Sequence, residues 1–360
     1  MSTKRVRIAV LGANFGASFA RIYAKHPDVE HVGVCDNNPK RLEALRAEGF
    51  TRLHSTWEEA TDSAAYDAVH ICLPVASHVE PTLAALKSGL HVACAVPMAM
   101  RIEDLRAIVA AQRESGRNYM MMETVAYCWE FFHVKELYQN GTLGHIQFMR
   151  AAHYQDLENL DPAWNGLPPM WYMTHAVAPL LALVGGTMSH VSSMGSGRMR
   201  ESFRRAHGNP YPIETAIFRV RGTDIAAEIT RSMIETAVQY KESFDIYGDK
   251  ATFVWAQFWG QKHSLLRLEP ISERIGRGVA VEPIEPVYPL HLLPEELRPF
   301  GTGGHGGSHP HLAHEFIRSI VEGRPPAIDA VTAANWCAPG ICAHESALRG
   351  GELVPIPEFS

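Results

Sequence analysis

The stretch that decides the fold is Val6-Arg7-Ile8-Ala9-Val10-Leu11-Gly12-Ala13-Asn14-Phe15-Gly16, near the N-terminus. It begins with a short apolar run of the kind expected of a buried parallel strand. A glycine-containing turn at residues 12–16 follows, and apolar residues at Phe19, Ile22 and Tyr23 then predict a helix. A second apolar strand at residues 29–35 ends in Asp36. Together these segments predict a βαβ unit.

This βαβ unit has the features of a dinucleotide-binding turn. Gly12 permits a tight turn, Gly16 lets the backbone and the helix come close, and the N-terminus of the helix faces a pyrophosphate. Asn14 stands where such turns have a second glycine, and asparagine tolerates left-handed backbone better than most residues. We therefore expect a Rossmann domain in which Gly12, Asn14, Phe15 and Gly16 contact the cofactor.

The residue at the end of the second strand selects the cofactor. A carboxylate at this position accepts hydrogen bonds from the adenosine ribose hydroxyls and repels a 2′-phosphate. Asp36, followed by Asn37, therefore predicts NAD in preference to NADP. Arg41 is close in sequence, and we expect it to lie with Lys40 on the solvated face of the next helix.

The composition is that of an ordinary globular protein. The chain has 360 residues, enough for two domains with their own cores, and we place the boundary between residues 1–123 and 124–360. It is 46% hydrophobic and 20% charged, with a net charge of −6, which argues against a membrane span and a nucleic-acid groove. The apolar strand starts so early that no signal peptide is expected, which predicts a cytoplasmic location. The six cysteines show no metal-site spacing and are expected to be buried thiols.

A segment at residues 89–97, Gly-Leu-His-Val-Ala-Cys-Ala-Val-Pro, resembles the Gfo/Idh/MocA family of sugar oxidoreductases. That family has Gly-Lys-His-Val followed by Glu-Lys-Pro, and its lysine lies beside the nicotinamide and assists proton movement at the reacting carbinol. This chain keeps Pro97 but has Ala95 and Val96 where the acid and the lysine belong. A valine side chain cannot donate, accept or hold a charge. Either the acid–base chemistry has moved to other residues, or the reaction is not an ordinary dehydrogenation.

Two further segments of the first domain resemble this family. Leu73 and Pro74 end a strand, and His78 follows, as in a family loop that covers the nicotinamide ribose. His78 can also bond the backbone at the start of a helix. Glu123 ends the last strand expected in the Rossmann domain, where we place a cofactor or substrate hydroxyl contact, the alternative being a structural ion pair.

The resemblance implies a second domain with an open, mostly antiparallel β-sheet and helices on one face. Turn residues at 221–224 and 248–250 lie between β-rich runs and predict two hairpins. An open sheet leaves a broad face uncovered, and such faces usually associate, so a homodimer or higher homo-oligomer is expected. The apolar strand positions that could supply this face are Phe218, Val220, Phe244, Ile246, Phe253 and Trp255, half of which must face the domain's own helices.

The second domain also carries the segment with the most chemistry, residues 169–180. Most family members have two aspartates and a histidine here, and His175 matches that histidine while Trp171 and Ala178 replace the aspartates. The pattern Tyr172-x-Thr174-His175 instead resembles the branch of NAD-dependent α-N-acetylgalactosaminidases. Four further segments of this chain, residues 96–97, 121–127, 154–156 and 304–307, also resemble that branch. These segments include Tyr127, Tyr154, Asp156 and His305.

This branch implies a redox-neutral glycoside cleavage. NAD oxidises the sugar C3 hydroxyl, which acidifies the C2 proton; elimination expels the C1 substituent, water adds, and the ketone is reduced back. Tyr172 and His175, three residues apart on one helical face, can both point into one pocket and carry the proton transfers. Tyr154 and Asp156 should face the same side of a strand, so at least one of them could reach the sugar, and Trp171 is expected in the pocket wall.

Other side chains are candidates for substrate contact. Arg198, Arg200, Arg204 and Arg205 form a basic loop, usually a solvated feature, though guanidinium groups also suit an anionic sugar. The histidine-rich residues 303–314 invite a zinc interpretation. Because no cysteine or acidic cluster completes the set, we expect no metal, and we expect a mobile loop in which His305 or His309 touches the sugar.

Three functions compete on these grounds. The first is redox-neutral glycoside cleavage, and the second is a conventional NAD-dependent dehydrogenase of a sugar or cyclitol with His175 as its base. The third is a dinucleotide-binding regulator without catalysis. The retained pair of Tyr172 and His175, together with Asp36, argues against the third.

Overall fold

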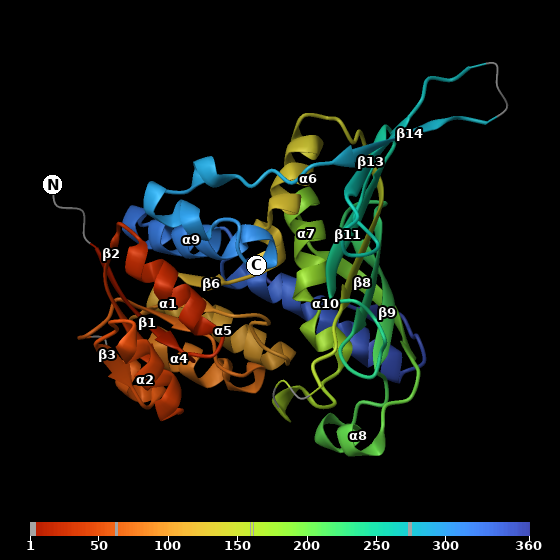
Figure 1. The fold of residues 1–360 in the computed structure, drawn as a ribbon. Coiled ribbons are helices and arrows are strands. Elements are labelled where there is room, and N and C mark those ends of the chain that lie inside the picture. Colours follow the sequence, from red (N-terminus) through yellow and green to blue (C-terminus); the bar gives the residue numbers. More distant parts are fainter. Residues whose placement is uncertain (1–4, 62–63, 159, 161, 273–275) are drawn as a thin grey trace. The chain divides into compact units, whose positions relative to one another are not determined.

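The computed structural model describes residues 5–61, 64–158, 160, 162–272 and 276–360 (Figure 1). These residues form two compact units. Unit 1 comprises residues 1–128, 288–337 and 359–360, and unit 2 comprises residues 129–287 and 338–358. The division differs from the boundary expected after residue 123, because residues 288–337 return to the first unit. No helix in the described part of the chain is long and apolar enough to span a membrane.

Unit 1 is built on a parallel sheet. Within the described residues its six strands have the order β3-β2-β1-β4-β5-β6. The elements before residue 128 are β1 (Val6–Leu11), α1 (Gly16–Lys25), β2 (Val29–Cys35), α2 (Pro39–Ala47), β3 (Arg52–His54), α3 (Trp57–Ala60), β4 (Ala68–Ile71), η1 (Val75–Ser77), α4 (Val79–Lys87), β5 (His91–Cys94), α5 (Ile102–Ser115), β6 (Tyr119–Met121) and η2 (Thr124–Tyr127). The order reverses between β1 and β4, the switch point at which such sheets bind ligands.

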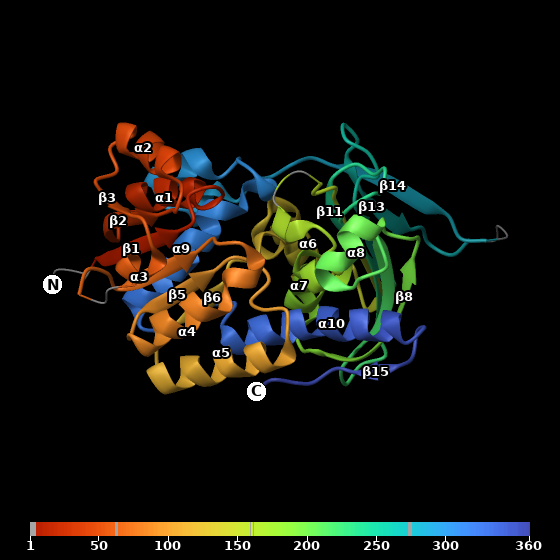
Figure 2. The same cartoon turned by 90° about the horizontal axis from the view of Figure 1, so that it is seen from below.

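The helices of unit 1 cover both faces of this sheet. Right-handed crossovers place α1 and α4 on opposite faces, because the strand order runs in opposite directions from the centre. Figure 2 shows α4 and α5 side by side, and their contacts agree. The returning segment contains η5 (Leu290–Leu292), η6 (Glu295–Phe300), η7 (His305–Gly307), α9 (Ser308–Glu322) and the first part of α10 (Ala330–Leu348). Buried Leu312, Phe316 and Ile317 of α9 belong to the core of this unit, and α9 packs against α1.

Unit 2 contains a mixed sheet that is mostly antiparallel. Its nine strands, counted among the described residues, have the order β14-β13-β12-β11-β7-β10-β9-β8-β15, and only β7 and β10 pair in parallel. The elements are α6 (Trp129–Gln139), β7 (Ile146–Tyr154), η3 (Pro162–Trp164), η4 (Pro169–Tyr172), α7 (Thr174–Val184), β8 (Met188–Ser196), α8 (Glu201–His207), β9 (Ile213–Val220), β10 (Ala226–Ser232), β11 (Lys241–Gly248), β12 (Ala251–Val254), β13 (His263–Leu268), β14 (Val279–Ile284) and β15 (Val354–Pro355). The two expected hairpins are present as β9–β10 and β11–β12.

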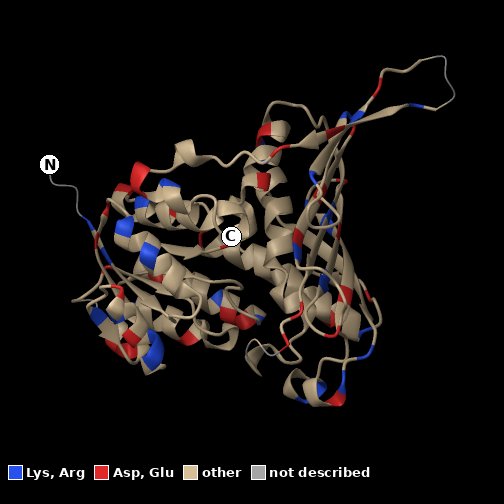
Figure 3. Ribbon diagram, viewed as in Figure 1, with Lys and Arg blue, Asp and Glu red and all other residues tan. Residues whose placement is uncertain are grey.

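One face of the unit 2 sheet is covered by helices. In Figure 1, α6, α7 and α10 lie along the same side of the sheet, and α7 contacts β7, β10 and β11. Phe218, Val220, Phe244, Ile246 and Phe253 are all buried in unit 2, so these five are not the surface that was expected to join two copies. Charged residues of both signs are interspersed along each unit (Figure 3).

Candidate active site

The turn after β1 packs so tightly against neighbouring residues that two of its positions require glycine. Gly12 has a φ of +97°, and a Cβ atom there would lie 2.5 Å from the carbonyl oxygen of Cys72. A Cβ at Gly16 would lie 2.7 Å from Cγ1 of Val10. Asn14 is exposed and is not among the left-handed residues, so its tolerance of that conformation is not what the turn uses. The cradle left by the two glycines, in front of the N-terminus of α1, fits a dinucleotide diphosphate.

Asp36 is buried at the end of β2, where it ties two backbone segments together. Its Oδ2 accepts a hydrogen bond from the Ala13 amide at 2.7 Å, and its Oδ1 accepts one from the Asn38 amide at 2.8 Å. The Arg41 guanidinium lies 3.4 Å from the Asp36 carboxylate. Arg41 was expected on a solvated face, but it forms an ion pair with Asp36. Asn37 is exposed, and Asn38, not Asn37, caps α2. Each carboxylate oxygen keeps a lone pair with which to accept from a ribose hydroxyl.

The histidine-rich segment lies against the dinucleotide turn inside unit 1. The ring of His309, in the first turn of α9, lies 4.7 Å from that of Phe19 and 5.4 Å from that of Phe15. The His305 ring lies 5.3 Å from the His309 ring and 6.2 Å from the Phe15 ring. The structure thus places both histidines beside the residue that caps α1. Their contact with a sugar remains a proposal.

His78 is buried between two carbonyl groups in unit 1. Its Nδ1 lies 2.8 Å from the oxygen of Pro97, and its Nε2 lies 2.9 Å from the oxygen of Leu73. Because carbonyl oxygens only accept hydrogen bonds, both ring nitrogens must donate, and the ring is an imidazolium. Burial opposes this charge, but Cys94 and the two carbonyl groups outweigh burial and raise the pKa to about 9. His78 therefore clamps the loop of Leu73 and Pro74 to the segment that carries Ala95, Val96 and Pro97.

The other candidates of unit 1 follow β6. Glu123 is buried, and its carboxylate accepts from the Val125 amide at 3.1 Å, so that it caps η2. Burial raises the pKa of Tyr127, and the neighbouring Glu315 adds to this effect. A hydrogen-bonded cap is the observed role of Glu123, and cofactor or substrate contact remains proposed for both residues.

In unit 2, four charged or titratable side chains form a row across the face of the sheet that α7 covers. Glu214 of β9 pairs in register with Arg231 of β10, Arg231 with His153 of β7, and His153 with Glu242 of β11. Directly paired residues share a face of the sheet. Three of the four are fully buried, and the Glu242 side chain is 10% exposed. Such a row of polar groups in a sheet interior requires partners, because burying an unpaired charge is costly.

Tyr172 and His175 lie over this row. Tyr172 ends η4, and His175 is in the first turn of α7, so that their ring centroids are 5.4 Å apart. The His175 ring lies 4.9 Å from the His153 ring, and its Nε2 is 3.8 Å from Oε1 of Glu242. The structure therefore brings together the two residues that the sequence pairs, and it adds His153 and Glu242.

Arg231 fixes the backbone around this cluster. Its guanidinium donates to the carbonyl oxygens of Tyr172 at 2.9 Å and His153 at 3.1 Å, to that of Ser232, and to the side chain of Gln155 at 3.0 Å. Burial lowers its pKa to about 9, which leaves the group charged near neutral pH. The cation lies 5.4 Å from the centre of the Tyr172 ring. A positive charge at this distance favours the phenolate that Tyr172 would form on giving up its proton.

Tyr240 completes the cluster from the segment before β11. Its hydroxyl donates to Oε1 of Glu242. Burial and the Glu242 charge raise the pKa of Tyr240, a residue that is 39% exposed overall. Sequence analysis missed Tyr240, Glu242, Arg231 and His153. The period-two pattern of their strands was the signal that could have found the last three.

The structure does not bring Tyr154 and Asp156 to this cluster. Tyr154 is adjacent to His153 in β7 and so faces the other side of the sheet, where it hydrogen-bonds Thr230. Asp156 lies beyond the end of β7, is exposed, and accepts from the Glu158 amide at 3.0 Å. The expectation that both share one side of a strand is wrong because the strand ends at Tyr154. Trp171 lies 5.5 Å from the ring of His344, at the edge of the same unit.

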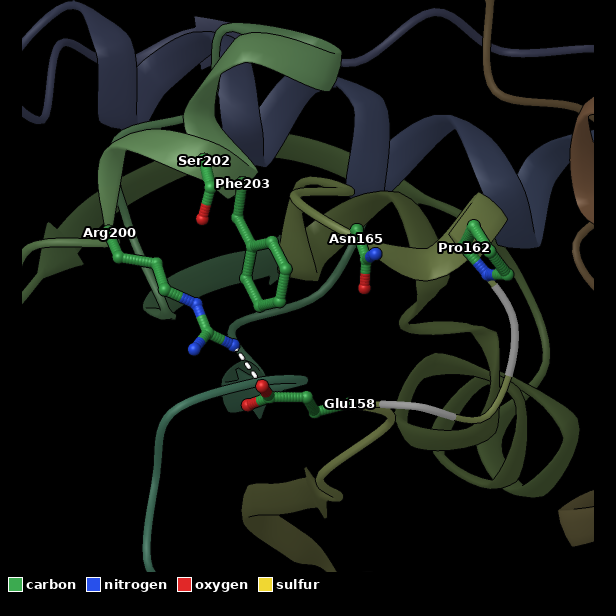
Figure 4. Close-up of a pocket in the computed structure, with 6 residues that line it drawn as sticks. All are labelled: Glu158, Pro162, Asn165, Arg200, Ser202 and Phe203. Atoms are coloured by element: carbon green, nitrogen blue, oxygen red, sulfur yellow. Dashed lines mark ion pairs between the residues drawn. The ribbon is translucent and has the colours of Figure 1, made fainter.

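The expectation of a basic loop is wrong for Arg204 and Arg205, which lie in helix α8. The pockets beside the four arginines contain none of Tyr172, His175, His153 and Glu242. One pocket has a volume of about 410 Å³. Figure 4 shows the residues that line it: Glu158, Pro162, Asn165, Arg200, Ser202 and Phe203. In it Arg200 forms an ion pair with Glu158, and a second one with Glu235 at 3.2 Å. Arg204 and Arg205 pair with Glu201. Arg198 is exposed and lines an adjacent pocket. Three of the four arginines therefore have glutamate partners, and their charges need no anionic sugar to balance them.

Comparison with known proteins finds similarity to one family and to relatives along the chain. Residues 6–123 match the model of an oxidoreductase family, Gfo/Idh/MocA, with an NAD-binding Rossmann fold. A glycosyl hydrolase family 109 protein of Saccharopolyspora erythraea is 24% identical, over 99% of this chain and 83% of that protein. An alpha-N-acetylgalactosaminidase of Bacteroides fragilis is also 24% identical, over 99% of this chain and 92% of that protein. Levoglucosan dehydrogenase in complex with NADH has the same fold, with a TM-score of 0.81 at 19% identity over 99% of this chain and all of that one.

The chain is an NAD-dependent enzyme whose residues 6–123 match the Gfo/Idh/MocA model and whose fold is that of its structural relatives. Relatives that match nearly the whole chain are named as a family 109 glycosyl hydrolase and an alpha-N-acetylgalactosaminidase. The expected resemblances to the Gfo/Idh/MocA family and to its glycosidase branch are therefore confirmed. The predicted fold class and the cofactor, NAD, are confirmed as well.

Proposed function

We propose that this enzyme cleaves glycosides in a redox-neutral cycle that begins with oxidation of the sugar at C3. NAD, when bound, accepts a hydride from C3 and later returns it, so that the net reaction is hydrolysis. The relatives named as glycosyl hydrolases and an α-N-acetylgalactosaminidase support a glycoside substrate. The ion-paired arginines give no reason to require an anionic sugar.

The observation that carries this proposal is the pair formed by the partly buried Tyr172 and the buried His175, in a chain that has Val96 at the family's lysine position. Their ring centroids are 5.4 Å apart, and both lie over the polar row of unit 2. A cycle of oxidation, elimination, water addition and reduction moves protons at C3, at C2 and at the incoming water. One lysine with one ordinary pKa serves a single proton transfer, whereas a tyrosine and a histidine with different charge states can serve several.

The neighbouring residues would set the charge states of this pair. Arg231 places a positive charge 5.4 Å from the Tyr172 ring and stabilises a phenolate there. Glu242 lies 3.8 Å from Nε2 of His175 and stabilises an imidazolium. We therefore assign Tyr172 as the base that removes a proton from the substrate, and His175 as the group that holds a proton for the leaving or entering oxygen. Arg231 and Glu242 are positioning residues.

The acid–base assignment is tested by Tyr172→Phe and His175→Ala. Each should lower turnover of a responsive glycoside by about 10²–10⁴-fold, the usual contribution of a positioned acid or base. NAD affinity, measured by calorimetry, should stay unchanged because the cofactor turn belongs to unit 1. Tyr247→Phe and His145→Ala are matched controls, since both side chains lie outside the cluster.

Two outcomes would contradict the assignment. Wild-type turnover in both Tyr172→Phe and His175→Ala would remove this pair from the chemistry. Stoichiometric release of NADH with each product molecule would replace the hydrolytic cycle by a conventional dehydrogenase.

A further inference from the structure

Three side chains of unit 2 direct ligand atoms at one point. His153, His175 and Glu242 each offer one nitrogen or oxygen, and these three atoms all lie within 4.8 Å of one another. Within the part of the chain that the structure describes, no other group of three or more histidine, cysteine or acidic side chains meets this geometry. We propose that these three residues bind one divalent transition-metal ion, with zinc as the best fit.

The distances favour a shared ion over direct hydrogen bonds between these three groups. Nε2 of His153 and Nε2 of His175 are each 3.8 Å from Oε1 of Glu242. A nitrogen–oxygen hydrogen bond spans about 2.7–3.2 Å, so neither histidine bonds the carboxylate directly. Ligands held ~2.0–2.1 Å from a tetrahedral zinc are ~3.4 Å apart. The two nitrogen–oxygen separations need to shrink by about 0.4 Å to close around an ion, and the two histidine nitrogens lie within 4.8 Å of each other.

The backbone presets this arrangement. His153 and Glu242 are direct partners across the β7–β11 ladder, and α7, which carries His175, packs on both strands. The three side chains are 1%, 4% and 10% exposed, so their rotamers are confined by packing. Tyr240 donates a hydrogen bond to Glu242, which is the support that metal-binding carboxylates usually have.

The donor set selects the kind of ion. Two imidazoles and one carboxylate suit zinc, cobalt and nickel, whereas magnesium and calcium prefer sites made of oxygen atoms. Two histidines and a glutamate also leave a fourth position open, as in catalytic zinc sites. The Arg231 cation is directed to four oxygen acceptors, none of which is one of the three proposed ligand atoms. It lowers the attraction for a second cation without blocking the site.

The site bears on the proposed function, because one of its ligands is the proposed acid–base residue His175. An ion coordinated by Nε2 of His175 displaces the proton from that atom. Metal and proton therefore compete for one nitrogen, and zinc should inhibit the enzyme. This consequence rests on the proposed function, whereas the binding of metal does not. No local pattern predicts a metal site at these three residues, because only the histidine-rich residues 303–314 suggest one.

The test measures metal binding without turnover. Full-length protein is stripped with a chelator, and Zn²⁺ is titrated by calorimetry. We expect one equivalent to bind, with affinity reduced at least tenfold in each of His153→Ala and Glu242→Gln. His145→Ala removes an exposed histidine of the same unit and should bind like wild type. Thermal unfolding of each variant shows that it is folded, and Glu242→Gln preserves the shape of the side chain.

Cobalt supplies an independent readout. Co²⁺ bound by the trio should give visible absorption bands of a tetrahedral site in wild type and His145→Ala, and these bands should be lost in His153→Ala. Weak binding of several ions that is equal in all variants would show that only surface histidines take metal, and it would overturn the proposal. Because neither readout uses a substrate, failure here leaves the acid–base assignment to its own test.

Discussion

At the scale of single residues, the chain lacks the cation of the family's lysine and keeps the histidine that resembles the family's at His78. Val96 is 7% exposed and carries no charge where the family has lysine. The buried His78, bonded to the carbonyl groups of Leu73 and Pro97, keeps a positive charge in unit 1. This imidazolium has no proton to exchange while both nitrogens donate to carbonyl oxygens. It can hold the loop together, but it cannot perform the lysine's acid–base role.

The charge on His78 predicts a pH-dependent contribution to stability. Its folded-state pKa is raised from 6.5 to about 9, so its contribution is complete below pH 6.5 and is lost as pH rises through 9. A shift of this size corresponds to about 3 kcal/mol. The difference in unfolding free energy between wild type and His78→Gln, measured with urea at several pH values, should shrink across this window. A difference that grows with pH would mean that His78 is neutral in the folded protein.

Asp36 predicts the choice of cofactor. Asp36→Ala should weaken NAD binding and narrow the preference for NAD over NADP, on the scale of about 1–3 kcal/mol for a charged hydrogen bond. The residual Arg41 side chain, now without its carboxylate partner, is available to a 2′-phosphate. Calorimetric titration with both cofactors checks this expectation. Equal affinity of the wild type for NAD and NADP would remove Asp36 from its assigned role.

At the scale of elements, the polar row was open to prediction and was missed. In β9, Ala216, Phe218 and Val220 are buried at alternate positions, and extending that period backward reaches Glu214. In β10 the alternation of buried positions continues from Ile229 to Arg231. In β7 and β11 the same period of two includes His153 and Glu242. Each strand thus shows where its charged residue faces. Only the pairing register, which depends on long-range contacts, shows that the four meet.

Glu214 connects three elements and predicts a large loss of stability when it is removed. Its Oε1 contacts Nδ1 of His344 in α10 at 2.6 Å, and its Oε2 accepts from the Met170 amide at 3.0 Å. Glu214→Ala should destabilise the protein by about 3–5 kcal/mol, as breaking a buried pair does. Glu214→Gln, which keeps the shape and one acceptor, should cost about 1–3 kcal/mol. Equal unfolding free energies of the two variants would contradict this account.

At the scale of the whole molecule, the local patterns of the sequence do not show how far each unit extends along the chain. The βαβ unit, the hairpins and the pair of Tyr172 and His175 all follow from local patterns, and the structure contains them. The return of residues 288–337 to unit 1 does not, because it depends on how α9 packs against α1. For the same reason the local pattern does not show that His305 and His309 lie beside Phe15.

Association of copies remains a prediction at this scale. The uncovered face of the unit 2 sheet carries Ile217, 49% exposed, and Met194, 56% exposed, on neighbouring strands. We expect a homo-oligomer that uses this face, and Ile217→Arg should weaken it. Light scattering at micromolar concentration checks both statements. A single mass near 39.9 kDa for the wild type would rule out the oligomer.

The central claim is that the chain performs a redox-neutral cleavage that passes through a C3 ketone. The most direct measurement is turnover in deuterated water of a glycoside found by screening, followed by NMR of the released sugar. The account predicts deuterium at sugar C2 and no net accumulation of NADH, because the C2 proton is removed to solvent and NAD is regenerated in each cycle. Products without deuterium at C2, together with steady release of NADH, would contradict it.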